Sequence, residues 1–226
     1  MHIGALLGSG RTADVYALDG PWVLRRYRHG IDTTGELAVM SYLSASGFPV
    51  PRIGPPAEDS LPTDLVVQRL TGPTLAEALL AGTVSESAGA DLLARLLREL
   101  HAIPPRLSQD PGDRILHLDL HPENVILTPE GPRVIDWLTA DEGPPALDRA
   151  MTSLILAQAA LDPSFPAGAQ VRDLLPALLS RFEGDGGVPI DALARATALR
   201  ATNPQLTAHE RAVLDEAAEL VASPAA

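Results

Sequence analysis

The fold of this chain is decided by His117-Leu118-Asp119-Leu120-His121-Pro122-Glu123-Asn124-Val125-Ile126-Leu127 and, after a turn, by Val134-Ile135-Asp136-Trp137. The turn contains Thr128-Pro129-Glu130-Gly131, and proline second with glycine fourth is the order that a type I turn prefers. The two apolar runs on either side are therefore predicted to form a β-hairpin. We expect this hairpin to bring Asn124, just before its first strand, close to Asp136, just after its second.

Three polar residues of this stretch suit phosphate chemistry. A charged group beside short apolar strands is unfavourable unless it has a partner. Asn124 and Asp136 offer oxygen ligands to Mg²⁺, which takes few protein ligands and shares the rest with phosphate and water. Asp119, five residues before Asn124 on the preceding loop, is then placed to accept a proton from a hydroxyl group.

Three other interpretations of the stretch stay open. His117, Asp119 and His121 alternate like the metal ligands of a hydrolase, although Pro122 would end such a strand and the other histidines are scattered. Asp119 can also be a residue that simply starts a turn or caps a helix. Finally, the stretch can belong to an inactive site that is kept for the fold.

The rest of the chain divides into a β-rich front and a helical back. In the front, short apolar runs alternate with glycine turns and predict strands at 3–7, 15–18, 22–28 and 65–67. Thr33 followed by Glu36 is the pattern of a capping box, and it predicts a helix that stops near residue 47. In the back, the spacing of apolar residues predicts helices at 75–80, 88–101, 146–161, 170–182, 189–201 and 207–222. The chain is therefore expected to be α+β, with two lobes at 1–70 and 71–226.

The stretch at 117–137 resembles the catalytic loop and the metal-binding aspartate of kinase-like phosphotransferases, and most closely those of the aminoglycoside phosphotransferase family. Two further runs strengthen the resemblance, Leu100-His101-Ala102-Ile103-Pro104 and Asp148-Arg149-Ala150. The resemblance implies a bilobal protein-kinase-like fold, with a β-rich N-lobe and a mainly α-helical C-lobe. It also implies that Asp119 is the catalytic base and that Asn124 and Asp136 hold Mg²⁺. His117 is then the structural first residue of the loop, and Asp148 supports the loop.

The resemblance further implies that the N-lobe binds ATP or GTP. The run Leu7-Gly8-Ser9-Gly10-Arg11-Thr12-Ala13-Asp14-Val15 fits a glycine-rich loop, in which backbone N–H groups approach phosphates without a Cβ in the way. Ala13 replaces the third glycine, and Gly-Ser-Gly is also a common hairpin loop. By resemblance, Val15 and Val23 pack on the adenine, and the backbone of the hinge segment Gln68-Arg69-Leu70 binds it.

Arg25 stands where the family has lysine. Strand alternation puts Val23 and Arg25 on one face, so Arg25 is the basic residue that can reach the phosphates. A guanidinium is bulkier than an ammonium group and binds as a fork, so the contact is either kept in altered geometry or lost. The other interpretation is a solvated run of arginines at 25, 26 and 28. Glu36 is implied to pair with Arg25, or it completes the capping box with Thr33, and both can hold.

Composition narrows the set of partners. The 226 residues include 17 basic residues, all arginine, against 29 acidic residues, which gives a net charge of -12. Such a chain is a poor binder of nucleic acid or of anionic membranes. The chain has no cysteine, which excludes disulfides and thiolate catalysis. We see neither a signal peptide nor an apolar run of the ~20 residues needed to span a membrane, so we expect a cytoplasmic protein.

A small molecule is the expected phosphate acceptor. The 11 residues between Asp136 and Asp148 are too few for the segment with which protein kinases bind a peptide. The negative charge suits a cationic hydroxylated molecule such as an amino sugar or aminoalcohol, although surface acids more often serve solvation. Candidate acids for binding it are Asp141, Glu142, Glu183, Asp185 and Asp191.

We therefore expect a small-molecule kinase that moves the γ-phosphoryl group of ATP or GTP to a hydroxyl group. The alternative is a nucleotide-binding pseudokinase that acts as a scaffold or sensor. Arg25 and Ala13 favour that alternative, whereas Asp119, Asn124 and Asp136 oppose it. Because lysine is missing from the whole chain, its absence at position 25 is weak evidence of inactivity.

Overall fold

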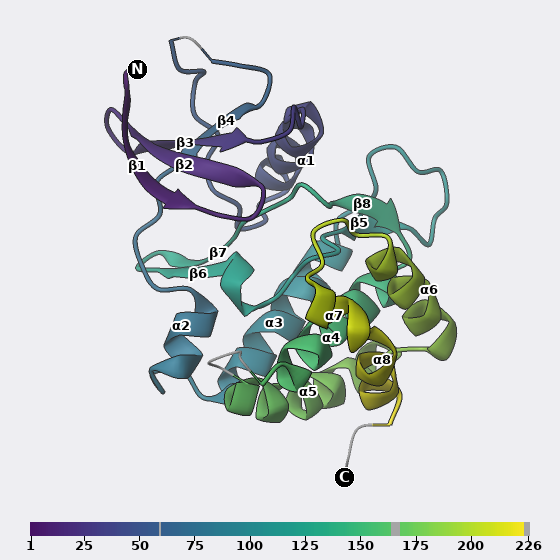
Figure 1. The fold of residues 1–226 in the computed structure, drawn as a ribbon. Coiled ribbons are helices and arrows are strands. Elements are labelled where there is room, and N and C mark those ends of the chain that lie inside the picture. The colour runs from purple at the N-terminus through teal and green to yellow at the C-terminus, as the bar shows by residue number, and fades with distance from the viewer. Residues whose placement is uncertain (59, 164–167, 224–226) are drawn as a thin grey trace. The chain divides into compact units, whose positions relative to one another are not determined.

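The computed structural model describes residues 1–58, 60–163 and 168–223 (Figure 1). Its internal contacts divide the chain into two compact units, which are described separately. The first unit contains Met1–Gly72 and Ile126–Leu138, and the second contains Pro73–Val125 and Thr139–Ala226. The segment from 126 to 138 therefore belongs with the front of the chain. No helix in the described part of the chain has the length and apolar character needed to cross a membrane.

The first unit is built on an antiparallel sheet with the strand order β1-β2-β3-β4. Its strands are β1 (Ile3–Ser9), β2 (Ala13–Leu18), β3 (Trp22–Tyr27) and β4 (Asp64–Gln68). All four were predicted, although β1 ends two residues later and β2 begins two residues earlier than expected. Backbone bonds from Gly54 N to Val66 O and from Gln68 N to Arg52 O add residues 52–54 to the outer edge of β4. No strand was predicted in this proline-rich segment.

The register of β2, β3 and β4 separates two faces of this sheet. Tyr16, Leu24 and Val66 are paired across the strands, and the last two lie in a buried cluster with Leu18 and Ala57. Arg25 is paired with Val15 on one side and Leu65 on the other, so it faces the opposite way. The predicted alternation along β3 is confirmed.

The start of helix α1 (Thr34–Ala45) differs from the prediction. Thr33 occupies the N-cap position, but its side chain caps no N–H group of the helix. Its hydroxyl instead donates to Pro62 O and Asp64 O, while Asp32 accepts the N–H of Thr34. The capping box is therefore wrong. Glu36 is buried, and its carboxylate therefore needs hydrogen-bond partners. Arg25 and Tyr27 supply these partners, and the N–H groups at the helix start do not.

The predicted hairpin is present as β6 (Val125–Thr128) and β7 (Gly131–Val134). Val134 N donates to Pro49 O. The buried ring of Trp137 packs edge-to-face on the ring of Phe48, with 5.7 Å between the ring centroids. Gly72 passes close to the hairpin with φ +143, and a Cβ there would lie 2.0 Å from Leu127 O. Only glycine fits at this approach.

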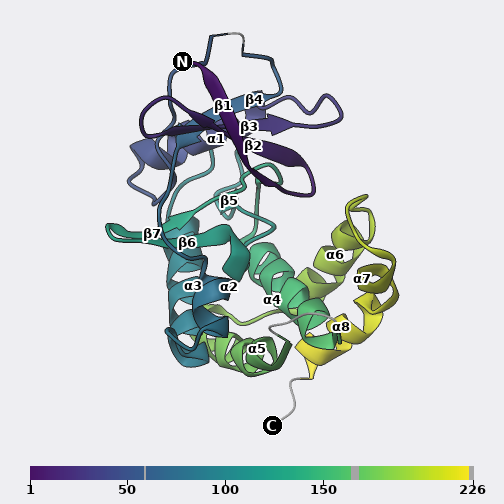
Figure 2. The same ribbon diagram turned by 60° about the vertical axis from the view of Figure 1, so that its left-hand side comes forward.

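The second unit is mainly helical (Figure 2). Helix α4 is almost wholly buried because α5, α6 and α8 all pack against it. The predicted helices are confirmed, except that the expected helix at 207–222 is divided at Val213. A short antiparallel pair, β5 (Arg114–Leu116) with β8 (Asp141–Gly143), was not predicted because both runs are too short to show a period. The helices are α2 (Leu75–Leu80), α3 (Glu86–His101), α4 (Pro145–Leu161), α5 (Gly168–Phe182), α6 (Ile190–Ala201), α7 (Ala208–Ala212) and α8 (Leu214–Ala222), with short 3-10 turns η1 (Pro122–Asn124) and η2 (Glu183–Asp185).

Candidate active site

A fully buried carboxylate, Asp148 in the first turn of α4, holds the loop that follows β5. Its Oδ2 accepts the N–H of His117 at 2.9 Å, and its Oδ1 accepts the N–H of Leu118 at 2.8 Å. His101 Nε2 lies 3.0 Å from the same Oδ2. Burial acts to raise the pKa of Asp148, but His101 and the N–H of His117 hold that pKa below its ordinary value.

These bonds hold Leu118 in a left-handed conformation, with φ +59, that a leucine rarely adopts. His117 fixes the other side of the turn from within the core. Its Nδ1 accepts the N–H of Asp119 at 3.2 Å, and its carbonyl accepts the hydroxyl of Thr139 at 3.0 Å. His117 is thus a buried residue that shapes the loop, and the loop presents the side chain of Asp119.

Asp119 is partly exposed, at 29% of its side chain. Its Oδ2 lies 3.4 Å from Asn124 Nδ2 and 3.8 Å from His121 Nε2, and its Oδ1 lies 3.5 Å from Arg200 Nη1. Burial acts to raise the pKa of Asp119, but His121, His117 and Arg200 together hold it below its ordinary value. The carboxylate is therefore ionised at neutral pH and accepts rather than donates hydrogen bonds. It caps no helix, which removes that interpretation.

Asn124 presents its amide with a defined orientation. Its Nδ2 donates to Asp119 O at 2.8 Å, so its Oδ1 points the other way. Within the described part of the chain no hydrogen bond reaches that oxygen, which leaves it suited to bind a hard cation such as Mg²⁺. That the hairpin brings Asn124 close to Asp136 stays a prediction.

The metal site of a hydrolase is not formed. Residues 117, 119 and 121 all lie in described parts of the chain, and in these parts no three His, Asp or Glu side chains are grouped to hold a metal ion. The reason is local, because His117 turns its ring inward onto the N–H of Asp119.

In the first unit, one guanidinium meets two carboxylates. Arg25 Nη1 lies 3.2 Å from Glu36 Oε1, and Nη2 lies 3.2 Å from Asp136 Oδ2. Arg25 has 16% of its side chain exposed, so it does not belong to a solvated run of arginines. Its neighbours also have partners, since Arg26 binds Asp64 and Arg28 binds Asp14.

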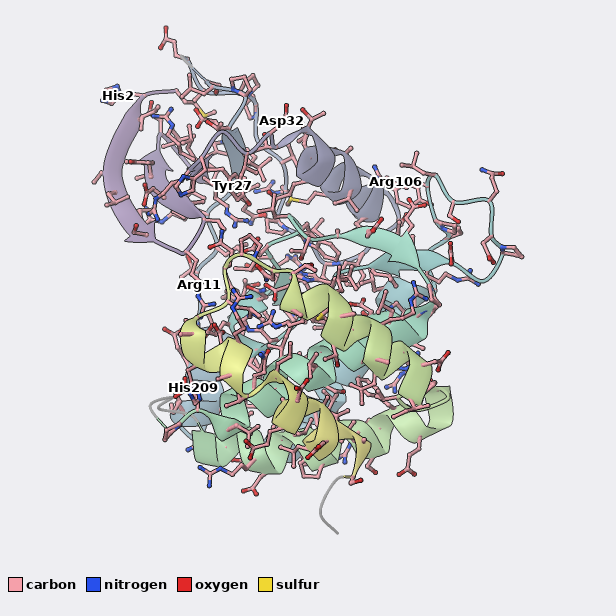
Figure 3. All side chains as sticks on the ribbon, turned by 45° about the vertical axis from the view of Figure 1, so that its right-hand side comes forward. His2, Arg11, Tyr27, Asp32, Arg106 and His209 are labelled. Atoms are coloured by element: carbon pink, nitrogen blue, oxygen red, sulfur yellow. The ribbon has the colours of Figure 1, made fainter. Side chains whose placement is uncertain are left out.

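Glu36 is the centre of this arrangement. Tyr27 donates its hydroxyl to Oε2 at 2.6 Å, and the N–H of Trp137 donates to Oε1 at 3.2 Å. Burial raises the pKa of Glu36, although Arg25 and Tyr27 oppose that rise. Figure 3 shows Tyr27 in the first unit, where its ring also faces the guanidinium of Arg25 at 5.1 Å. Asp136 itself has φ +68, a conformation that Asp and Asn tolerate better than most residues.

The glycine-rich segment forms the end of β1 and the turn into β2, because Gly8 and Ser9 are still paired with Val15 and Asp14 and Gly10 follows the strand. Arg28 binds this turn. The guanidinium of Arg28 donates to Gly10 O at 3.1 Å and also binds Ser9 and Asp14. A Cβ added at Gly8 would meet nothing within 4 Å, and one at Gly10 would meet only Ala13 O at 3.6 Å. Neither glycine has the positive φ that a turn can demand. The packing of the protein therefore does not explain these two glycines. That they allow close approach of a phosphate group stays a prediction.

The hinge segment offers one main-chain donor for a nucleotide base. Gln68 N donates to Arg52 O at 2.8 Å and Arg69 N to Pro21 O at 2.7 Å. Leu70 N makes no hydrogen bond with the described residues, so it is the N–H that an adenine ring can use. Val23 lies on the face of the sheet that carries Arg25, as predicted, and Val15 lies on the same face because it is paired with Arg25. That both pack on an adenine stays a prediction.

Three of the five acids proposed to bind the phosphate acceptor form bonds within the protein, and the other two lie at the start of helical segments. Glu142 accepts the main-chain N–H groups of residues 106–108 and so holds the loop on which Figure 3 shows Arg106. Asp141 caps the N–H of Glu142, and Asp185 pairs with Arg98 at 3.4 Å. Glu183 begins η2, and Asp191 lies in the first turn of α6.

Sequence reasoning missed Arg200, which contacts Asp119, and the two residues that contact Arg200 in turn. Arg200 on α6 reaches Asp119, and it also contacts Gln158 on α4 and Glu210 on α7. An arginine in the last turn of a helix ordinarily signals only a favourable interaction with the helix end. The sequence therefore carried no sign that this arginine is buried.

Comparisons with known proteins show the family and the fold. A profile of the phosphotransferase enzyme family (APH) matches residues 4–115 and 108–184. No curated protein sequence matches the chain significantly.

Solved structures of small-molecule kinases share the fold. The streptomycin and ATP complex of APH(2")-IIa is similar at 15% identity and a TM-score of 0.59, over 87% of this chain and 84% of that chain. Choline kinase LicA from Streptococcus pneumoniae is similar at 14% identity and a TM-score of 0.57, over 99% and 94%. A choline/ethanolamine kinase family protein from Mesorhizobium loti is similar at 15% identity and a TM-score of 0.56, over 97% and 86%. With more than half of its residues matched by the family profile, the chain belongs to the phosphotransferase enzyme family and is a kinase of small molecules.

Proposed function

We propose that this kinase moves the γ-phosphoryl group of ATP, in the presence of Mg²⁺, to a hydroxyl group of an amino sugar or aminoalcohol. Asp119 accepts the proton of that hydroxyl group, and the oxygen of the acceptor hydroxyl forms a bond to the γ-phosphorus. The bond from the γ-phosphorus to the bridging oxygen breaks, and ADP leaves with the electron pair. Such transfer depends mainly on positioning and charge neutralisation.

The observation that carries the proposal is the fixed loop around Asp119. Asp148 holds the loop in its left-handed turn, and His117 supports the N–H of Asp119. The side chain of Asp119 is ionised and partly exposed, as a proton acceptor must be. A loop that served the fold alone would not need an exposed carboxylate held by Asn124 and Arg200.

The residues for nucleotide and metal fit the same reaction. The backbone around Gly8, Ser9 and Gly10 and the guanidinium of Arg25 would bind the phosphates, and Leu70 N would bind the base. Asn124 Oδ1 and the carboxylate of Asp136 would hold Mg²⁺, which, when bound, neutralises charge on the phosphate oxygens. The hard oxygen donors of these two side chains suit that ion.

A small cationic acceptor is supported by two observations. The segment after Asp136 is occupied by β8, which pairs with β5, and by Thr139, which bonds to His117, so it does not extend to bind a peptide. The chain carries a net charge of -12, and similar folds occur in proteins solved with streptomycin and gentamicin and in a choline kinase.

The test is a search for phosphorylated product across aminoglycosides and aminoalcohols, by mass spectrometry with Mg-ATP and, separately, Mg-GTP. We expect one acceptor class to be phosphorylated with ATP, and Asp119→Asn to abolish product formation. Thermal stabilisation by Mg-ATP without product, unaltered by Asp119→Asn, would instead identify a nucleotide-binding pseudokinase.

A further inference from the structure

Arg200, in the last turn of α6, is a buried arginine whose guanidinium reaches the catalytic loop. Its side chain is 9% exposed, and an arginine this buried is uncommon without partners. Nη1 lies 3.5 Å from Asp119 Oδ1, Nη2 lies 4.0 Å from Glu210 Oε1, and Nε donates to Gln158 Oε1 at 2.8 Å. One planar group therefore meets the loop, α4 and α7 together.

Gln158 fixes the direction in which this fork points. Its Nε2 donates to Glu210 O at 2.6 Å, so its Oε1 is turned toward Arg200. Gln158 is 2% exposed, and the alternative side-chain orientation would leave a buried donor facing the guanidinium. Because a guanidinium is rigid, the bond at Nε sets where its two Nη groups lie.

Asp119 is held from two directions, and Arg200 supplies one of them. Oδ2 faces Asn124 and His121, while Oδ1 faces Arg200. The last torsion of an aspartate side chain is broad, so a carboxylate bound at a single oxygen can rotate. A misplacement of about 1 Å at a reacting group can lower a rate by ~100-fold.

We propose that Arg200 is a positioning residue for Asp119 in phosphoryl transfer. It sets the rotation of the carboxylate toward the acceptor hydroxyl and ties the loop to α4 and α7. The inference rests on the proposed function, in which Asp119 accepts the proton. A merely structural arginine would join the helices without influencing the base.

The first test measures the contact without any activity. Urea unfolding is compared for wild type, Arg200→Gln, Asp119→Asn and the double variant. We expect the effect of Arg200→Gln on the unfolding equilibrium constant to be about threefold or more smaller when Asp119 is already Asn. Strictly additive effects would overturn the inference.

The second test separates positioning from helix packing, using the acceptor identified above. We expect Arg200→Gln to lower kcat by about tenfold or more with little change in KM for ATP, and Arg200→Lys to recover part of the loss. The matched control is Arg211→Gln, because Arg211 on α7 donates to Ala201 O and Leu206 O of the neighbouring segment. We expect this control to keep the wild-type kcat.

Two results distinguish this inference from the proposed function. If the wild-type chain phosphorylates none of the acceptors, the proposed function is wrong and the positioning role falls with it. If the wild type is active and Arg200→Gln keeps its kcat, or if Arg211→Gln shows the same loss, the inference about Arg200 alone is wrong.

Discussion

Arg25 Nη2 lies 3.2 Å from Asp136 Oδ2, so the basic residue of β3 binds directly the aspartate that follows the hairpin. The other end of the same fork lies 3.2 Å from Glu36 on α1. Burial acts to lower the pKa of Arg25, but Asp136, Tyr27 and Glu36 together raise it, so the group stays charged. A lysine ammonium is a single point charge and cannot span two carboxylates in this way.

Replacing Arg25 by lysine is therefore expected to preserve or raise turnover. The ammonium group can keep the pair with Glu36 and would free Asp136 for the proposed Mg²⁺ site. Arg25→Ala, in contrast, leaves Glu36 buried without its cation. We expect it to raise KM for ATP and to lower the free energy of unfolding by about 3 kcal/mol. Steady-state kinetics and urea unfolding measure both effects.

The control for this pair of variants is Arg26→Ala. Arg26 is the next residue of β3, points to the other face and binds Asp64 at 2.7 Å and 2.8 Å. We expect it to alter stability without changing KM for ATP. If Arg25→Ala leaves ATP affinity and rate untouched, the assignment of Arg25 to the phosphates is wrong.

Asp136→Asn is expected to lower turnover by about 100-fold or more, because a neutral amide binds Mg²⁺ and its phosphates more weakly than a carboxylate. Asparagine tolerates the left-handed conformation at φ +68, so the backbone is kept. The variant should therefore unfold at a temperature close to that of the wild type, and raising the Mg²⁺ concentration should recover part of the activity. Wild-type turnover in this variant would contradict the proposed metal role.

The β-hairpin and the β3 alternation could be predicted from the sequence because turn chemistry and a period of two are local signals. The capping box was wrong for a tertiary reason. The pattern of Thr33 and Glu36 is the same whether Glu36 bonds to the helix start or to a distant arginine, and burial beside Arg25 and Tyr27 decided between them.

The contacts around Asp119 show the same limit. Arg200 is 81 residues away along the chain. It lies beside the loop because α6, which carries it, packs against α4. The residues 52–54 at the edge of β4 and the β5–β8 pair were missed because isolated bridges and three-residue strands have no recognisable period. The sequence therefore predicted features that depend on neighbouring residues, and it did not predict contacts between residues that are far apart along the chain.

Gly8→Ala and Gly10→Ala are expected to fold normally and to bind ATP severalfold more weakly. The space around both Cβ positions is open within the protein, so the added methyl group disturbs no packing. It does obstruct the close approach of phosphate oxygens to the backbone. Thermal unfolding with and without Mg-ATP measures both properties in one experiment.

Gly35→Ala is the matched control, because Gly35 lies in α1 and its Cβ position is also open. Alanine favours a helix interior over glycine by about 1 kcal/mol, and by less in the first turn, so this variant should be at least as stable as the wild type and should keep its ATP affinity. Equal ATP affinity in all three variants would show that the segment around Gly8 and Gly10 is only a hairpin loop.

Asp148→Asn is expected to destabilise the protein by about 3 kcal/mol or more at neutral pH, and to reduce turnover. The new amide N–H₂ group would face at least one of the donors, His117 N or Leu118 N, so the left-handed turn before Asp119 loses its support. Urea unfolding and kcat measure the two effects. Asp185→Asn is the control, since that residue forms a more exposed pair with Arg98 and should change stability little.

The stabilising effect of Asp148 is expected to depend on pH and to be lost at low pH. The pKa of Asp148 is lower in the folded chain than its ordinary value of 3.8, so the folded state favours the ionised form. Its contribution is fully present above about pH 5 and is lost progressively as the pH falls through the ordinary value toward the folded one. The wild type should therefore lose stability faster than Asp148→Asn between about pH 5 and pH 2, and the two free energies of unfolding should converge. A difference between the two proteins that stays constant over this range would show that the ionised carboxylate is not what holds the loop.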